Sequence, residues 1–203
     1  MPRVSAEHLE RRRQQILDAA QLCFARKGFY ETSMQEIFTE SDLSAGAVYR
    51  YFKSKNEIIA ALAAETTVEL RAAMTRTIRS DPLPTPAQLV RVIAEYVVAH
   101  SGPDGPVRLA PQAWALALVH AEAAEYVKGA VVAMRDRWTE YVGRMVQVGW
   151  LPADTDIHAV TTAIIGFMPG FILQHLIIGD PDPETLARGV ATLLPYGEPA
   201  AQT

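Results

Sequence analysis

The stretch SAGAVYRYFKSKNE, residues 44–57, predicts a short helix, a turn and the start of another helix. Ser44 is a favourable amino-terminal cap for the first of these helices, and Leu43 and Val48 have the spacing of a hydrophobic staple across that cap. The helix nevertheless opens on the smallest side chains available, Ala-Gly-Ala at residues 45–47, with bulky residues directly behind them. This order of sizes distinguishes it from an ordinary amphipathic helix.

Small side chains at the front of a helix permit a close approach to another surface. A helix that enters the major groove of DNA must bring its amino-terminal backbone near the bases and phosphates, and bulky first-turn residues would hold it away. Ala45, Gly46 and Ala47 permit that approach, and the positive end of the helix dipole would then face phosphate. The same three residues also suit a tight crossing between packed helices, with the nearby tyrosines as ordinary surface residues.

Groups that can bind DNA flank these small residues. Ser44 can cap the helix or contact DNA, and the hydroxyls of Tyr49 and Tyr51 can donate to phosphate oxygens. Arg50 can reach either a phosphate or a guanine edge. Lys55, in the first turn of the next helix, is expected to face the same DNA backbone.

Two helices with clear sequence signals precede this stretch. Residues 11–27 have helical periodicity and end at Gly28. Ser33 and Glu36 form a capping box for a second helix that runs to about residue 40. The side chains expected to hold the third helix from the inside are Ile16, Phe24, Ile37, Val48 and Phe52.

Helical periodicity continues through the rest of the chain, without a convincing alternating strand pattern. A fourth helix begins at Ser54, which forms a capping box with Glu57, and runs to about residue 79. Thr85 caps the next helix, and Pro86 occupies its first position. Further helices are expected over residues 107–120, 122–148, 156–178 and 183–194. The expected fold class is therefore all-α.

Composition and charge are those of a soluble globular protein with a basic head. Charged residues make up 21% of the 203 residues and apolar residues 49%, which is an ordinary globular composition. Residues 1–55 hold nine basic and seven acidic side chains, whereas the remainder is acidic and brings the net charge to −4. The single cysteine, Cys23, and the polar first ten residues indicate a reducing, cytoplasmic location.

Residues 32–59, TSMQEIFTESDLSAGAVYRYFKSKNEII, resemble the helix-turn-helix segment of the tetracycline-repressor (TetR) family. Residues 11–30, with the run RRRQQILDAAQLCFARKGF at residues 11–29, resemble the first helix of that family, including the Gly-Phe pair that ends it. The resemblance implies an amino-terminal three-helix DNA-binding head over residues 1–54. It also implies a carboxy-terminal helical-bundle body over residues 55–203 that binds a ligand and dimerises.

The resemblance also implies which residues contact DNA. Thr32 or Ser33 would contact phosphates together with Lys55. The residues expected in or beside the major groove are Ser44, Ala45, Gly46, Ala47, Tyr49, Arg50 and Tyr51. The chain departs from the family at Ser41-Asp42, where the turn commonly has Ala-Gly, and at Phe38, where a small residue is frequent. Asp42 can adopt the left-handed conformation that the turn requires, although its charge would lie near DNA.

One recognition helix reads too few base pairs to select a site within a genome, so two copies of the head are expected. A two-fold dimer predicts a roughly palindromic operator. Residues 159–179 are apolar nearly all round and are expected to be shared between the core and a dimer partner, although their length also meets the membrane-span criterion. In the family, the last two long helices form a four-helix interface, which here corresponds to residues 122–148 and 156–178.

By resemblance, the body binds a small-molecule effector. The candidate pocket residues are His100, Trp114, Leu118, Met134, Trp138, Tyr141, Phe167, Phe171, Gln174 and His175, each of which also suits an ordinary core role. This lining favours an apolar or aromatic ligand, and no cofactor or metal is expected because no ligand spacing supports one.

No catalytic motif has its necessary companions: a glycine-rich phosphate loop and a Gly-x-Ser-x-Gly elbow are both absent from the sequence. The sequence therefore predicts a homodimeric, ligand-responsive DNA-binding transcriptional regulator that is not an enzyme, with a repressor favoured by the habit of the family. The main alternative is an all-helical protein-interaction module that uses residues 159–179 to bind a partner. A helical enzyme is a more distant alternative.

Overall fold

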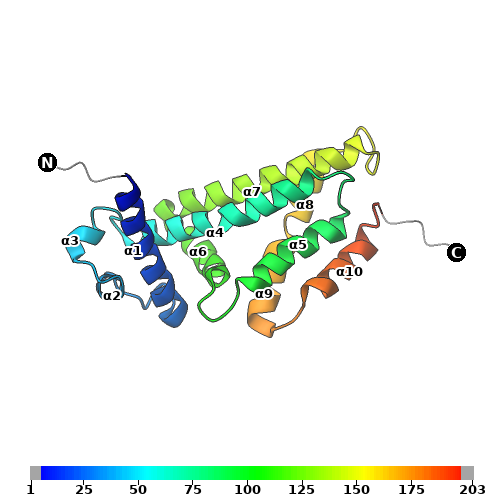
Figure 1. The fold of residues 1–203 in the computed structure, drawn as a ribbon. Coiled ribbons are helices and arrows are strands. Elements are labelled where there is room, and N and C mark those ends of the chain that lie inside the picture. The colour runs from blue at the N-terminus through cyan, green and yellow to red at the C-terminus, as the bar shows by residue number, and fades with distance from the viewer. Residues whose placement is uncertain (1–5, 198–203) are drawn as a thin grey trace. The chain divides into compact units, whose positions relative to one another are not determined.

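The computed structural model describes residues 6–197, apart from a few side chains within helices, and these residues are helical with connecting turns and no strand. In chain order the helices are α1 (Ala6–Lys27), α2 (Met34–Glu40), α3 (Ala45–Val48), α4 (Lys55–Ile78), α5 (Pro86–Ala99), the 3₁₀ turn η1 (Pro106–Arg108), α6 (Leu109–Ala117), α7 (Ala121–Gln147), α8 (Ile157–Ile164), α9 (Phe167–Ile178) and α10 (Pro183–Leu193) (Figure 1).

The chain forms two compact units. The head unit contains residues up to Thr66 together with Ser101–Lys128, and the body unit contains Thr67–His100 together with residues from Gly129 onward. Helices α4 and α7 each contribute one part to each unit. The three amino-terminal helices thus share a unit with η1, α6 and the start of α7, a grouping that the sequence does not predict.

An apolar core holds the head unit together. Ile16, Phe24, Ile37 and Val48 are all fully buried in one cluster, and Phe52 joins them. The cluster also includes Leu109, Ala113 and Leu116 from α6. The predicted inward-facing residues of the third helix are therefore confirmed, and the short α3 is held in place by burial of apolar side chains rather than by its own length.

The helix ends in the head form as their sequence signals indicate. The hydroxyl of Ser33 accepts from the Glu36 amide, and the Glu36 carboxylate accepts from the Ser33 amide, so the predicted capping box is present. Gly28 follows α1 with a φ of 82°, in the left-handed region that glycine adopts without strain. At the start of α4 the Ser54 hydroxyl accepts from the Glu57 amide, but the Glu57 carboxylate accepts from the Lys53 amide instead.

The body unit packs its helices around a buried aromatic pair. Trp138 and Tyr141 of α7 are almost completely buried and meet edge to face with ring centroids 6.1 Å apart. The Tyr141 hydroxyl donates to the carbonyl of Pro84 at 2.7 Å, and burial raises the pKa of this phenol. Helix α5 begins at this point, with a Thr85–Gln88 capping box, and packs along α10.

Two predicted helices are wrong in detail. The helix predicted over 156–178 is interrupted at residues 165–166, between α8 and α9. Pro169 explains the break, because a proline lacks an amide hydrogen and its ring clashes with the carbonyl four residues earlier, here that of Ile165. The helix predicted over 107–120 begins as the 3₁₀ turn η1 and ends at Ala117.

The segment Ile157–Ile178 is long and apolar enough to cross a membrane by length and composition, and 22% of its most apolar window is buried. In the single chain, α9 exposes Leu173, Ile177 and Ile178. The expected burial of this segment on both sides is therefore not seen within the single chain.

Candidate DNA-binding surface and body cavity

The first turn of α3 is open at its front. Ala45 and Gly46 are exposed, Ala47 is half-buried, and a Cβ added to Gly46 would meet no atom within 4 Å. A tight helix crossing would bury these residues, so that interpretation is wrong. The small side chains leave room in front of the helix for another molecule.

Side chains behind the first turn orient α3. Ser44 caps the helix by accepting from the Ala47 amide at 3.3 Å. Tyr49 is 42% exposed, and its ring lies edge-on against Phe38 with centroids 5.4 Å apart. Phe38, the residue that departs from the family pattern, is therefore the packing surface for Tyr49. Arg50 is exposed, whereas Tyr51 is half-buried against the head core.

The turn between α2 and α3 has the predicted left-handed residue. Asp42 has a φ of 52°, and its side chain is exposed. Ser41 is buried beside it, and its carbonyl accepts from the Gln15 side-chain amide at 2.7 Å. The turn is therefore fixed to α1.

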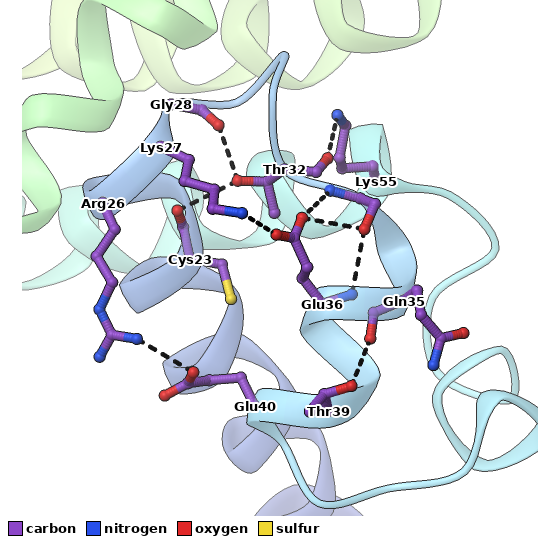
Figure 2. A network of polar contacts seen from close by, with 11 residues as sticks. Cys23, Arg26, Lys27, Gly28, Thr32, Gln35, Glu36, Thr39, Glu40 and Lys55 are labelled. Carbon is purple, nitrogen blue, oxygen red and sulfur yellow. Dashed lines mark hydrogen bonds and ion pairs between the residues drawn. The ribbon is translucent and has the colours of Figure 1, made fainter.

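Thr32 and Lys55 lie inside a polar network rather than at a free surface (Figure 2). Thr32 is 1% exposed, and its hydroxyl lies 2.8 Å from the Gly28 carbonyl and 3.2 Å from the Cys23 carbonyl. The Lys55 ammonium donates to the carbonyls of Phe29 and Thr32, each at 2.6 Å, and to that of Tyr30 at 3.3 Å.

Three acceptors match the three N–H donors of an ammonium group. The Lys55 nitrogen also lies 4.5 Å from the centroid of the Phe29 ring, and burial lowers its pKa. In this arrangement Lys55 ties the loop between α1 and α2 to the start of α4. Of the alternatives Thr32 and Ser33, only Ser33 has an exposed side chain.

Ion pairs join α1 to α2 beside this network (Figure 2). The Lys27 ammonium contacts the Glu36 carboxylate, and Arg26 pairs with Glu40 at 3.2 Å. The Lys27 contact, followed by donors from Ser33, lowers the pKa of Glu36 to about 2. The side chain of Cys23 lies under these pairs, and burial followed by the two carboxylates raises the pKa of its thiol. A thiol in that state is a packed core residue rather than a reactive one.

Lys53 is a candidate DNA contact that sequence reasoning missed. Its side chain is exposed in the connection between α3 and α4, and its ammonium donates to the Tyr49 carbonyl at 2.7 Å. Two of its donors therefore remain for other acceptors. Its place two residues before Lys55 was the available sequence signal.

A cavity of about 210 Å³ lies within the body unit. Three of the predicted ligand-binding residues line it: Trp138, Tyr141 and Phe167. Further lining side chains from α5, α8, α10 and the following turn include Val90, Val160, Val190 and Tyr196, which sequence periodicity did not single out.

The other predicted pocket residues lie elsewhere in the described structure. Trp114 and Leu118 belong to the head unit, where Leu118 is 87% exposed. His100 caps the end of α5 and stacks on Tyr96 with ring centroids 4.0 Å apart. The remaining four also lie outside the lining: Met134 is on α7, and Phe171, Gln174 and His175 are on α9. Phe171 stacks with His175, and the Gln174 side-chain amide donates to the Gly170 carbonyl.

Helix α3 is exposed, begins with small side chains and follows α2 after a tight turn. This arrangement defines the chain as a helix-turn-helix protein. Residues 16–62 match the sequence model of the bacterial regulatory proteins of the tetR family. Over 76 residues the chain is 38% identical to an HTH-type transcriptional repressor of Mycobacterium tuberculosis, an alignment that covers 37% of this chain and 41% of that protein. The head therefore matches the DNA-binding segment of the TetR family over these residues.

Solved structures share the fold of most of the chain. A TetR-family transcriptional regulator of Syntrophomonas wolfei superposes with a TM-score of 0.74 at 15% identity, covering 96% of this chain and all of that one. FadR of Bacillus subtilis, solved in complex with stearoyl-CoA, superposes with a TM-score of 0.73 at 18% identity, covering 89% of this chain and 96% of FadR. The predicted all-α fold, with a helix-turn-helix head and a helical body, is confirmed.

Proposed function

We propose that the chain is a DNA-binding transcriptional regulator that acts as a repressor. The observation that carries the proposal is the open front of α3, where Ala45 and Gly46 are exposed between the capping residue Ser44 and the exposed Arg50. The similarity of the head to a transcriptional repressor of Mycobacterium tuberculosis supports the same function. Arg50 reads a base edge, Ser33, Tyr49 and Lys53 contact phosphates, and the small residues permit the approach.

The regulator acts as a homodimer on a roughly palindromic operator. One short helix reads only a few base pairs, so specificity within a genome requires a second head. The exposed apolar side chains of α9, Leu173, Ile177 and Ile178, supply a face that a second copy would bury. The same face would serve the alternative, a protein-interaction module without DNA binding.

A small apolar ligand in the body releases the DNA by binding better to the conformation in which the two heads no longer match their half-sites. FadR, whose fold this chain shares, was solved with stearoyl-CoA, which supports a ligand-binding body but leaves an acyl-CoA as a competing ligand class. The protein is proposed to be cytoplasmic and not an enzyme.

Selection of bound fragments from the genome of the host tests the proposal. We expect a palindromic motif, and with that operator Arg50→Ala should lose affinity for the motif by about ten-fold or more while binding to random DNA changes less, because a base contact is worth about 1–3 kcal/mol. Arg135→Ala, at an exposed arginine of α7, is the control. Failure to enrich any DNA would favour the protein-interaction alternative.

A further inference from the structure

The cavity of the body unit has walls of one chemical kind. None of the side chains that line it is charged, and those with an N–H or O–H group are Trp138, Tyr141 and Tyr196. The hydroxyl of Tyr141 is already used, because it donates to the Pro84 carbonyl at 2.7 Å. An ionised ligand group would therefore lose its hydration without gaining an opposite charge.

The size of the cavity favours a ligand of one ring with a short substituent. An apolar protein cavity of about 150 Å³ stays dry and binds benzene. This cavity has about 210 Å³, which leaves room for a few further atoms but is smaller than the roughly 300 Å³ at which pockets for drug-sized ligands begin.

One residue that lines the cavity, Trp138, carries a buried donor. The indole N–H of Trp138 has no hydrogen-bond partner among the described residues, and the residue is 1% exposed. An unpaired buried donor is unfavourable, and a ligand acceptor placed beside it would relieve that cost. Tyr196 lines the same cavity, but its half-buried ring is open to solvent.

We propose that this cavity is the effector site and that it takes a small, neutral, single-ring ligand carrying one hydrogen-bond acceptor for the Trp138 indole. The identification as an effector site rests on the proposed regulatory function, whereas the ligand chemistry rests on the cavity itself. The size of the cavity and its uncharged walls disfavour long-chain and anionic ligands at this site.

Calorimetric titration of the full chain with three probes tests the ligand class. Acetophenone and ethylbenzene are neutral and fit the cavity, and benzoate has the same ring and nearly the same size but carries a charge. We expect both neutral probes to bind and benzoate to bind at least about ten-fold more weakly than acetophenone. Equal binding of benzoate, or no binding of either neutral probe, would overturn the proposal.

Matched variants test the location. Val160→Trp fills the cavity from α8 and should weaken both neutral probes about ten-fold or more, whereas Ala159→Trp, at an exposed neighbour outside the lining, should not. Trp138→Phe should reduce the affinity for acetophenone relative to ethylbenzene by about five-fold, because only acetophenone has the acceptor. The ratio of the two affinities remains informative if one variant folds poorly. An unchanged ratio in Trp138→Phe would contradict the hydrogen bond between the indole and the ligand acceptor.

DNA binding by the unliganded protein is measured on the same preparation. Probe binding without operator binding would contradict the regulatory function and leave the cavity chemistry standing. Operator binding without probe binding would contradict the cavity proposal and leave the regulatory function standing. Operator release by acetophenone, and its loss in Val160→Trp, is the result expected if both are correct.

Discussion

At the scale of single residues, Lys55 is the clearest case of a side chain whose geometry changes its expected role. Its ammonium is within hydrogen-bond distance of three carbonyls of the loop between α1 and α2. A direct phosphate contact would require it to leave them. We propose that Lys55 is a positioning residue, which holds Ser33 and the start of α2 at the DNA-facing surface.

Lys55→Met should lower the free energy of unfolding by about 2 kcal/mol, because it removes charge-assisted hydrogen bonds and leaves buried carbonyls unpaired. The slope of log affinity against log salt concentration should stay unchanged. Lys53→Met, the matched change at the exposed neighbour, should reduce the magnitude of that slope by about 1 with little effect on stability. A reduced slope for Lys55→Met would instead restore the phosphate contact predicted from the sequence.

Glu36 makes the stability of the head depend on pH. Its pKa in the folded protein is about 2, below the ordinary value of 4.5, so its contacts stabilise the fold above pH 4.5 and are lost as the pH falls toward 2. In Glu36→Gln the melting temperature should be lower than in the unmodified protein at pH 6, and this difference should disappear near pH 2. Melting curves recorded between pH 6 and pH 2 test this prediction. Glu95→Gln, at an exposed carboxylate of α5, is the control.

Much of the residue chemistry of the head could be predicted from the sequence. The Ser33–Glu36 box, the Ser44 cap and the left-handed Asp42 are local features, which depend on residues a few positions apart. The role of Lys55 could not be predicted, because it depends on the conformation of a loop more than twenty residues earlier in the chain. Three carbonyls of that loop point toward the Lys55 ammonium.

At the scale of elements, the side chain of Gln112 links α6 by a hydrogen bond to the loop between α1 and α2. The Gln112 carbonyl oxygen accepts from the Phe29 amide at 2.7 Å, and its NH₂ group donates to the Arg108 carbonyl at 3.2 Å. Phe29 also provides a carbonyl to Lys55, so the same residue connects α6 and α4.

Gln112→Ala should expose the Phe29 amide to exchange, because it removes that amide's acceptor. We expect hydrogen exchange at Phe29, followed by NMR, to become about ten-fold faster, which corresponds to about 1.4 kcal/mol. Gln112→Glu keeps an acceptor at the same place and should retain most of the protection. Equal exchange rates in the two variants would show that the bond does not hold the loop.

The helices themselves were mostly predictable, and the exceptions have physical causes. Capping residues and periodicity indicate where α2, α5 and α7 lie to within a residue or two. The gap between α8 and α9 was missed because apolar composition continues through it, and the steric effect of Pro169 appears four residues before the proline itself.

At the scale of the whole molecule, the exposed apolar face of α9 carries the dimer proposal. Ile177 is 76% exposed, and Ile178 and Leu173 are exposed beside it. Ile177→Asp should give a monomer by light scattering at micromolar concentration, because the dimer would bury an unpaired charge. Operator affinity should fall about 100-fold or more, since each head would then bind alone.

Leu118→Asp provides the control for that experiment, because Leu118 is equally apolar and exposed but lies in the head unit at the end of α6. It should remain dimeric. A dimeric Ile177→Asp variant would move the interface away from α9.

The division of the chain and the composition of the cavity lie beyond sequence reasoning. Resemblance predicted a boundary at residue 54, yet α6 packs into the head core through Leu109, Ala113 and Leu116. Three of ten pocket candidates line the cavity, because helical spacing identifies an apolar face without identifying the helix opposite. Val190 and Tyr196 reach the cavity from a helix and a turn at the far end of the chain.

Helix α3 has only four residues and cannot persist without the core beneath it. The surface proposed to read DNA is therefore stable only while Val48 and Phe52 remain packed. Conservative substitutions in that core, such as Ile37→Val, would leave every proposed DNA contact in place. They would still destabilise the packing of α3 as the temperature rises. Temperature-sensitive regulation can thus arise from substitutions that never approach the operator.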